Sequence, residues 1–437
     1  MREGALKTSV LLRLMIIGVL TIVLLIPTLF VSLLISDRQA SRTFAVKEVT
    51  QKWGNAQTIV GPILTIPVTH QVAGKEGQIH THTSLVRILP NTLDVTAQLT
   101  PEIRQRGIYR LVLYTTRLSI QADYSSIAGT VQSLARGQIH WEDATVTLGI
   151  SDLKGIGEVH SMTWDNRAVS PEGGHRNAAF IPSGLTVRPL LVEQNNQHRF
   201  TVALDLRGSD EFRVVPSAKE TRMALQSSWK DPSFVGDFLP EDRNLGGESF
   251  SASWRVQDFN RNLPQSWVGD GPALMNSSFG VKLLLSVEEY QKISRALKYS
   301  IMFIALTFLA FFVLDMMTRS PFHPVHYAMI GFGLVLFYVL LLSLSEYLSF
   351  DLSYWSASLA IVLLITLYAK GVTSRLSTMA IIGTSLLVLY GFLFVLLQLA
   401  DYALLLGSFG LLIILGLVMY LTRRIDWYAI GRPSETT

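Results

Sequence analysis

Apolar runs of about 20 residues recur along this chain with uneven spacing. The first covers residues 14–35, and a long stretch of ordinary globular composition follows it. A run of this length matches the hydrocarbon thickness of a bilayer. The pattern predicts a membrane protein with six α-helical spans and one large domain between the first two spans. The five later spans are expected near residues 300–317, 326–345, 353–369, 378–397 and 402–421.

Between the first two spans, the hydrophobic pattern changes to the period of two that is typical of half-buried strands. Gly61, Pro62 and Pro67 interrupt the first of these segments, as expected at a bulged or edge strand. Short strands separated by turn residues indicate a β-rich, sandwich-like domain of paired sheets. The expected strands are 58–68, 83–90, 93–99, 108–124, 145–151, 200–208 and 250–256.

Helical segments are expected on both sides of this domain. Residues 37–53 have helical character and would form a stalk, and residues 287–299 predict an amphipathic helix that leads into the second span. Residues 165–177 indicate an exposed loop and the favoured position of an internal boundary. The predicted organisation is an N-terminal tail and anchor at 1–36, a β-rich domain at 37–298, a five-helix transmembrane bundle at 299–421 and a C-terminal tail at 422–437.

The first span could be an uncleaved anchor or a cleaved signal peptide. Its apolar run is longer than the usual hydrophobic core of a signal peptide. No A-x-A-like cleavage site precedes Asp37 and Arg38. These two features favour the anchor.

Positive charge outside the large domain falls on one side of the predicted topology. The short loops at 346–351 and 398–401 carry acidic residues and neither Lys nor Arg. By the positive-inside rule, both termini are cytoplasmic and residues 37–298 lie on the opposite side. The basic residues that decide this are Arg2, Lys7, Arg13, Arg319, Lys370, Arg375, Arg423 and Arg424.

Composition excludes several functional classes. The chain has no cysteine, which excludes disulfides, thiolate metal sites and cysteine nucleophiles. The net charge of +4 arises beside the predicted membrane, and the large domain is nearly neutral, so nucleic-acid binding has no support. Dinucleotide, Walker, H-E-x-x-H and G-x-S-x-G motifs are absent from the sequence. We therefore expect no catalytic residue, cofactor or metal.

Three acidic residues near span ends are candidate membrane-polar residues: Asp315, Glu346 and Asp401. An ionisable residue within a membrane is a functional hypothesis by default. All three are expected to reach interfacial water, which favours roles in topology and capping over an ion or ligand pathway. Charges in the middle of spans are absent from the sequence, and this argues against a proton-coupled transporter.

Histidines offer two further candidate groups. His80 and His82 alternate on a predicted strand and His70 lies nearby, a spacing found in some zinc sites. No third ligand is at a convincing spacing, so an exposed hairpin is favoured over a metal site. His323 and His326 flank Pro324, where a structural turn is favoured over a ligand pair.

The most distinctive soluble segments are 228–240 and 253–267, where aromatic residues lie among Pro, Gly and Asp. Such a cluster could form a surface that binds a partner or an envelope polymer. Alternatively, the rings could anchor irregular loops over a sheet edge. The candidate partner-binding residues are Trp229, Phe234, Phe238, Trp254 and Trp267.

Several blocks of sequence, in collinear order over nearly the whole chain, resemble the CreD family of bacterial inner-membrane proteins. One departure is Glu346-Tyr347, where a Glu-His pair is expected in that family. The blocks include GPILTIPV (61–68), DPSFVGDFLP (231–240), NRNLPQSW (260–267), HPVHY (323–327), FYVLLLSLSEYLSF (337–350) and YLTRRIDWY (420–428).

The resemblance implies an inner-membrane location, with residues 37–298 in the periplasm. It also implies a role in cell-envelope integrity, colicin tolerance and the response to β-lactam stress, under two-component control. It supplies no enzymatic activity, cofactor or catalytic residue. We therefore expect a non-enzymatic protein that contacts membrane lipid and binds an envelope or periplasmic component through its periplasmic domain. The alternatives are a transporter or channel component and a periplasmic hydrolase.

Overall fold

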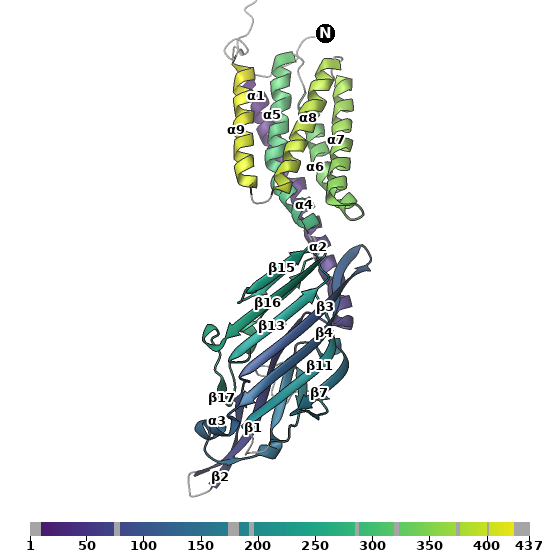
Figure 1. Ribbon diagram of the computed structural model, residues 1–437. Coiled ribbons are helices and arrows are strands. Elements are labelled where there is room, and N and C mark those ends of the chain that lie inside the picture. The colour runs from purple at the N-terminus through teal and green to yellow at the C-terminus, as the bar shows by residue number, and fades with distance from the viewer. Residues whose placement is uncertain are drawn as a thin grey trace, which may run out of the picture. The chain divides into compact units, whose positions relative to one another are not determined.

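The computed structural model describes residues 10–73, 79–173, 183–191, 196–284, 288–318, 323–372, 376–399 and 402–423. The chain forms two compact units (Figure 1). A helical unit contains the residues up to Arg42 and those from Ser286 onward, and a β-rich unit runs from Thr43 to Leu285. The two units are described separately below.

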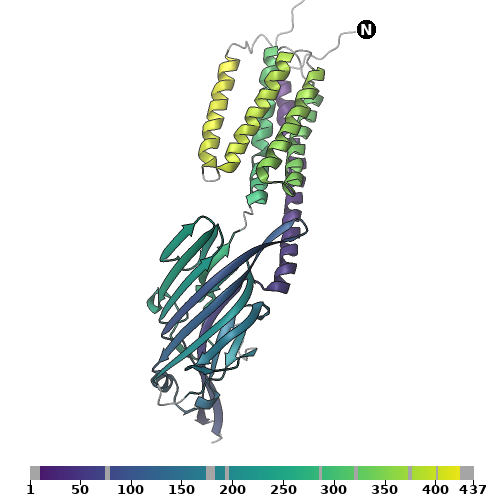
Figure 2. The same cartoon turned by 45° about the vertical axis from the view of Figure 1, so that its right-hand side comes forward.

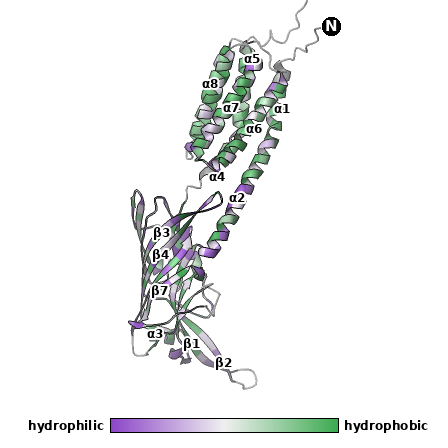
Figure 3. Ribbon diagram, turned by 90° about the vertical axis from the view of Figure 1, so that its right-hand side faces the viewer, coloured by the Kyte–Doolittle hydropathy of each residue, from purple (hydrophilic) through white to green (hydrophobic). Residues whose placement is uncertain are grey.

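Most helices of the helical unit are long and apolar (Figure 3). Among the described residues, five helices are long and apolar enough to cross a membrane. The number is six if α4 (Glu288–Lys298) and α5 (Ser300–Thr318), which meet at 50°, form one span. Each predicted span is helical, and the predicted amphipathic segment is α4. The helices are α1 (Val10–Val23), α2 (Leu25–Trp53), α4 (Glu288–Lys298), α5 (Ser300–Thr318), α6 (Pro324–Ser345), α7 (Phe350–Val372), α8 (Leu376–Gln398) and α9 (Ala403–Thr422).

The strands of the β-rich unit form two layers (Figure 2). The seven predicted strands are all present, and their alternating residues face a shared core. Five of them are longer than predicted, whereas β4 is shifted by one residue and β6 is one residue shorter. The first nine strands are β1 (Gln57–Ala73), β2 (Ile79–Ile88), β3 (Thr92–Arg106), β4 (Tyr109–Ser125), β5 (Gln138–Ile139), β6 (Thr145–Ile150), β7 (Ile156–Trp164), β8 (Arg167–Ala168) and β9 (Glu172–Gly173). The others are β10 (Gly184–Val187), β11 (Gln197–Ser209), β12 (Glu211–Val214), β13 (Glu220–Ser227), β14 (Pro232–Gly236), β15 (Asp242–Gly246), β16 (Ser249–Gln257), β17 (Ser266–Val268) and β18 (Phe279–Leu283).

Strand order joins distant parts of the sequence. One sheet runs β14-β18-β12-β1-β6-β10-β9, with β2, β5 and β17 attached beside β1 and β2, and the other runs β15-β16-β13-β3-β4-β11-β7-β8. Two of the pairings, β1 with β12 and β3 with β13, are parallel. One short helix, α3 (Ile127–Leu134), and several 3-10 turns connect the strands in the described part of this unit.

The first predicted strand is bulged and is not an edge strand. β1 pairs with β12, β6 and β2, and its register against β6 shifts between Val60 and Ile63. At the shift, backbone groups of β1 make hydrogen bonds to buried side chains instead of to β6. Ser217 Oγ accepts from the Gly61 amide (3.0 Å), and the Tyr124 hydroxyl donates to the Pro62 carbonyl (2.9 Å).

The predicted internal boundary at 165–177 does not divide the β-rich unit. Within its described part, β8 pairs with β7 and β9 pairs with β10. Trp164 and Leu185, on either side of the segment, belong to one hydrophobic core. The segment is therefore a connection within one domain, and the prediction of a boundary there is wrong.

Candidate functional site

The five aromatic candidates of the β-rich unit face its core. Trp254 is 2% exposed, and Phe234 packs edge-to-face against it with ring centroids 5.8 Å apart. Phe238 packs against Phe279 in the same way, and its carbonyl accepts from Trp254 Nε1 (3.2 Å). Trp229, half-buried, donates from Nε1 to the carbonyl of residue 284.

Trp267 is also buried, in a smaller cluster with residues of β1 such as Val60 and Ile63. This placement corrects the expected binding surface, because Trp254 and Trp267 are inaccessible and the other three rings pack on the core. The geometry matches the alternative interpretation, in which rings anchor irregular segments over the sheets. The aromatic residue of this region that remains open to solvent is Phe259, at 82% exposure.

The candidate membrane acids are less accessible than the sequence suggests. Asp315 on α5 is 2% exposed, so the expectation that it reaches interfacial water is wrong. The Glu346 side chain is 9% exposed and pairs with Arg38 of α2, with Nε and Oε1 3.3 Å apart. Asp401 lies outside the described residues. Tyr347, where the family is expected to carry His, is exposed.

The predicted histidine groups separate in the structure. His70 and His82 face each other across the β1–β2 ladder with ring centroids 5.0 Å apart, and His80 is exposed further along β2. No third histidine or acid joins them among the described residues. His323 caps the N-terminus of α6, and His326 bonds the Tyr368 hydroxyl (2.8 Å).

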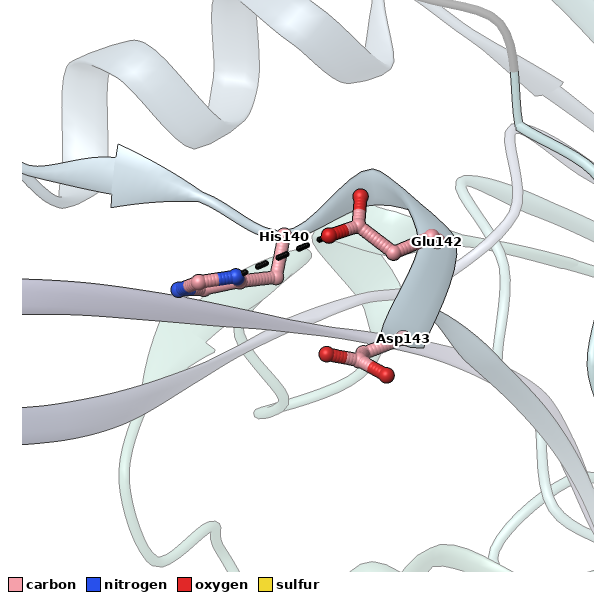
Figure 4. Close-up of side chains that lie close together, drawn as sticks. All are labelled: His140, Glu142 and Asp143. Atoms are coloured by element: carbon pink, nitrogen blue, oxygen red, sulfur yellow. Dashed lines mark ion pairs between the residues drawn. The ribbon is translucent and has the colours of Figure 1, made fainter.

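A third group was missed by the sequence interpretation. His140, Glu142 and Asp143 lie together on the turn between β5 and β6 (Figure 4). Their nearest ligand atoms all lie within 4.8 Å of one another. The sequence signal for this group is the compact pattern His-Trp-Glu-Asp at 140–143.

The eight-stranded sheet carries a shallow groove of about 310 Å³ across β3, β13, β16 and β15. Gln98, Gln226, Ser251 and Asn244 line it as one row, because each is the register partner of the next. None of these four side chains has a hydrogen-bond partner in the part of the chain that the structure describes. The described lining contains no charged side chain, and its remaining members are Leu99, Thr100, Ser227, Ser228, Gly246, Ser249 and Phe250.

Charged residues elsewhere on the same face bond to one another. Glu220 accepts from Arg255 Nε (2.6 Å) and Arg222 Nε (3.1 Å). Desolvation raises the pKa of Glu220, but the hydrogen bonds and positive charges of the two arginines together outweigh it, and the net pKa is lowered. Asp123 raises the pKa of Arg199 through a hydrogen bond of 2.6 Å. The groove is therefore an uncharged region of a sheet face on which Glu220 and Asp123 are each paired with arginine.

Comparison with known proteins gives a match along nearly the whole chain. The family model described as "Inner membrane protein CreD" matches residues 9–428. This chain belongs to the CreD family. The Inner membrane protein CreD of Escherichia coli (strain K12) is 32% identical over 421 residues, which cover 94% of this chain and 92% of that protein. As a CreD-family member, the chain is an inner membrane protein with multiple apolar helices and a two-sheet β-rich unit.

Similarity to solved structures is much weaker. A crystal structure of an M1 zinc metallopeptidase from Deinococcus radiodurans aligns with a TM-score of 0.22 and 10% identity, covering 44% of this chain and 42% of that one. A two-domain M1 zinc metallopeptidase aligns with a TM-score of 0.19 and 6% identity, covering 38% of each chain. Alignments at this level establish neither a shared fold nor a shared activity.

Proposed function

We propose that this CreD-family protein supports cell-envelope integrity as a non-enzymatic binding protein. The β-rich unit lies in the periplasm in this proposal, and both termini are cytoplasmic. The distribution of Lys and Arg among the short loops supports that orientation.

The absence of cysteine from the chain makes the orientation straightforward to test. A single cysteine in place of Ser119, which is exposed on β4, is expected to react with an impermeant maleimide in cells with a permeabilised outer membrane. A cysteine in place of Arg423 is expected to react only after the inner membrane is broken. The reverse pattern would invert the proposed topology.

The ligand in this proposal is an uncharged, hydroxyl- and amide-rich segment of an envelope glycan. The observation that carries it is the row Gln98, Gln226, Ser251 and Asn244, which lines the groove across four strands. Amides and hydroxyls both donate and accept, so such a row can match the hydroxyl and N-acetyl groups of a sugar chain. Because the groove lacks charge, it offers little attraction to an ionic ligand.

Co-sedimentation of the full-length protein, in detergent, with purified peptidoglycan tests the ligand class. Replacing Gln98 and Gln226 together by Ala is expected to lower the bound fraction at least threefold, because several hydrogen bonds are lost. The matched control carries the same Gln→Ala change at Gln121 and Gln257, which lie on the same sheet outside the groove lining. Equal binding by the groove variant and the wild type would overturn the proposal, as would failure of the wild type to sediment.

The same variants connect binding to envelope integrity. Cells that depend on the Gln98/Gln226 variant are expected to lose tolerance of β-lactam stress at normal protein level, whereas the control variant retains it. If cells with the Gln98/Gln226 variant tolerate β-lactam stress fully, the groove is not needed for the role in envelope integrity.

A further inference from the structure

His140, Glu142 and Asp143 are residue types that bind metals, and their ligand atoms lie within 4.8 Å of one another. We propose that these residues bind a divalent transition-metal ion of the Zn²⁺ type. His140 Nδ1 lies 3.8 Å from Glu142 Oε1, and the three side chains point to the same side of the turn (Figure 4). The ligand set would be one imidazole nitrogen and two carboxylates, which leaves coordination positions open to water.

The His140 ring is oriented by a hydroxyl behind it. Thr69 Oγ1 of β1 lies 2.8 Å from His140 Nε2, and Thr83 Oγ1 of β2 lies 3.4 Å from Thr69 Oγ1. If the Thr69 hydroxyl donates to Thr83, its oxygen accepts a hydrogen bond from the Nε2–H of His140. His140 is then unprotonated at Nδ1, and the lone pair of that nitrogen is directed at the carboxylates. Hydrogen bonding of the remote ring nitrogen is the usual way in which proteins fix a metal-binding histidine. Thr69 is therefore a positioning residue for His140.

The backbone beneath the cluster is held on both sides. The His140 amide donates to the Pro67 carbonyl of β1 (3.0 Å), and the Asp143 amide donates to the His140 carbonyl (3.3 Å). Trp141 packs against the core of the β-rich unit, and Ala144 is fully buried. The three ligand side chains thus project from a turn whose other residues are fixed, as a preorganised metal site requires.

Charge favours a cation at this position. Neither Glu142 nor Asp143 has a Lys or Arg within ion-pair distance among the residues that the structure describes. With a neutral imidazole, the cluster carries two uncompensated negative charges. An imidazole ligand favours Zn²⁺ and similar ions over Mg²⁺ and Ca²⁺, which take oxygen ligands.

A small movement would complete the geometry. Tetrahedral Zn²⁺ with bonds of about 2.0–2.2 Å places neighbouring ligand atoms roughly 3.3–3.5 Å apart. The 3.8 Å separation of Nδ1 and Oε1 is close to this range. The Glu142 side chain is 76% exposed, so it can rotate toward the ion without displacing packed atoms.

Calorimetric titration of the tag-free full-length protein with Zn²⁺ tests the proposal. We expect the wild type to bind one Zn²⁺ with micromolar or tighter affinity, and His140→Ala, Glu142→Gln and Asp143→Asn each to weaken binding at least tenfold. His82→Ala is the matched control and is expected to leave binding unchanged, because His82 lies outside the cluster. Near-ultraviolet circular dichroism establishes that each variant is folded.

Thr69 provides an independent readout. Thr69→Val is expected to weaken Zn²⁺ binding several-fold, whereas Thr69→Ser, which keeps the hydroxyl, restores it. Substituting Co²⁺ in the wild type is expected to give visible absorption that His140→Ala abolishes. The proposal is overturned if the wild type fails to bind Zn²⁺ at a concentration 100 times the expected micromolar dissociation constant. It is also overturned if folded His140→Ala binds Zn²⁺ as tightly as the wild type. Loss of binding in His82→Ala alone would assign the metal to the His70–His82 pair instead.

Discussion

Buried tyrosines are used differently in the two units of this protein. In the β-rich unit, Tyr114 and Tyr124 are almost fully buried, and each hydroxyl donates to a backbone carbonyl, Glu211 at 2.7 Å and Pro62 at 2.9 Å. Burial raises the pKa of both phenols, which therefore remain donors at any physiological pH. Each of these tyrosines thus satisfies a carbonyl on another strand.

In the helical unit, Tyr338, Tyr354 and Tyr390 are equally buried, on α6, α7 and α8. Tyr354 donates to the Tyr390 carbonyl (2.7 Å), but the Tyr338 and Tyr390 hydroxyls make no hydrogen bond within the described part of the chain. Phe337 instead contacts all three rings, with centroids 4.8–5.4 Å apart. The comparison teaches that both buried tyrosines in the sheets act through their hydroxyls, whereas Tyr338 and Tyr390 in the bundle act mainly through their rings.

The largest effect is expected from removing the hydroxyl at the β1 bulge. Tyr124→Phe leaves the Pro62 carbonyl, which lies at the register shift, without this donor, so we expect a loss of about 1–3 kcal/mol of unfolding free energy. Denaturant unfolding of the full-length protein in detergent, followed by tryptophan fluorescence, measures it. Tyr109→Phe at the half-buried start of β4 serves as the control. Equal midpoints for the two variants would contradict the assigned role of the Tyr124 hydroxyl.

A smaller effect is expected from a hydrogen-bonded acid on the outer sheet face. The folded-state pKa of Glu220 is lowered, so its contribution to stability is present above the unfolded value, near pH 4.3, and is lost as pH falls through the folded value. Glu220→Gln is expected to cost about 0.5 kcal/mol at pH 7, where solvent screens this surface pair. Thermal unfolding at pH 7 and pH 3 measures the difference, which should become smaller at the lower pH. A difference that persists or grows on acidification would show that Glu220 acts other than by its charge.

The smallest effect is expected in the bundle. Tyr338→Phe keeps the ring and removes a buried hydroxyl that has no partner among the described residues, so the unfolding free energy should change by less than about 0.5 kcal/mol, or rise. Denaturant unfolding of the detergent-solubilised protein measures it. A loss above about 1 kcal/mol would reveal a partner, such as a bound water, and would remove the contrast with Tyr124.

The sequence was sufficient for features that depend on local pattern. Span lengths follow from apolar runs, and the period of two gave the seven strands. The bulge in β1 was indicated by Gly61 and Pro62, although its interior position in the sheet was not, because pairing partners such as β12 lie far away in sequence.

Features that depend on non-local packing were not predictable. Phe234 lies in a segment rich in turn residues, where the pattern does not reveal which side faces the core. Trp254, by contrast, alternates with Phe250 and Val256 in the predicted strand 250–256, so its burial could have been predicted. The groove row joins residues 98, 226, 244 and 251, which meet only through strand register. The burial of Asp315 depends likewise on which side of α5 its neighbours cover. The His140 cluster, by contrast, is local and could have been recognised from its spacing.

The parallel pairings have a consequence for how the protein is made. β1 and β3 are synthesised early, yet their partners β12 and β13 begin at residues 211 and 220, and β18 between β12 and β14 comes later still. Pairings of such long sequence separation form slowly. A growing chain therefore carries open strand edges on β1 and β3 until most of the domain has emerged, and such edges invite wrong pairing. Biogenesis of this protein should depend on assistance that shields its first strands until the last ones arrive.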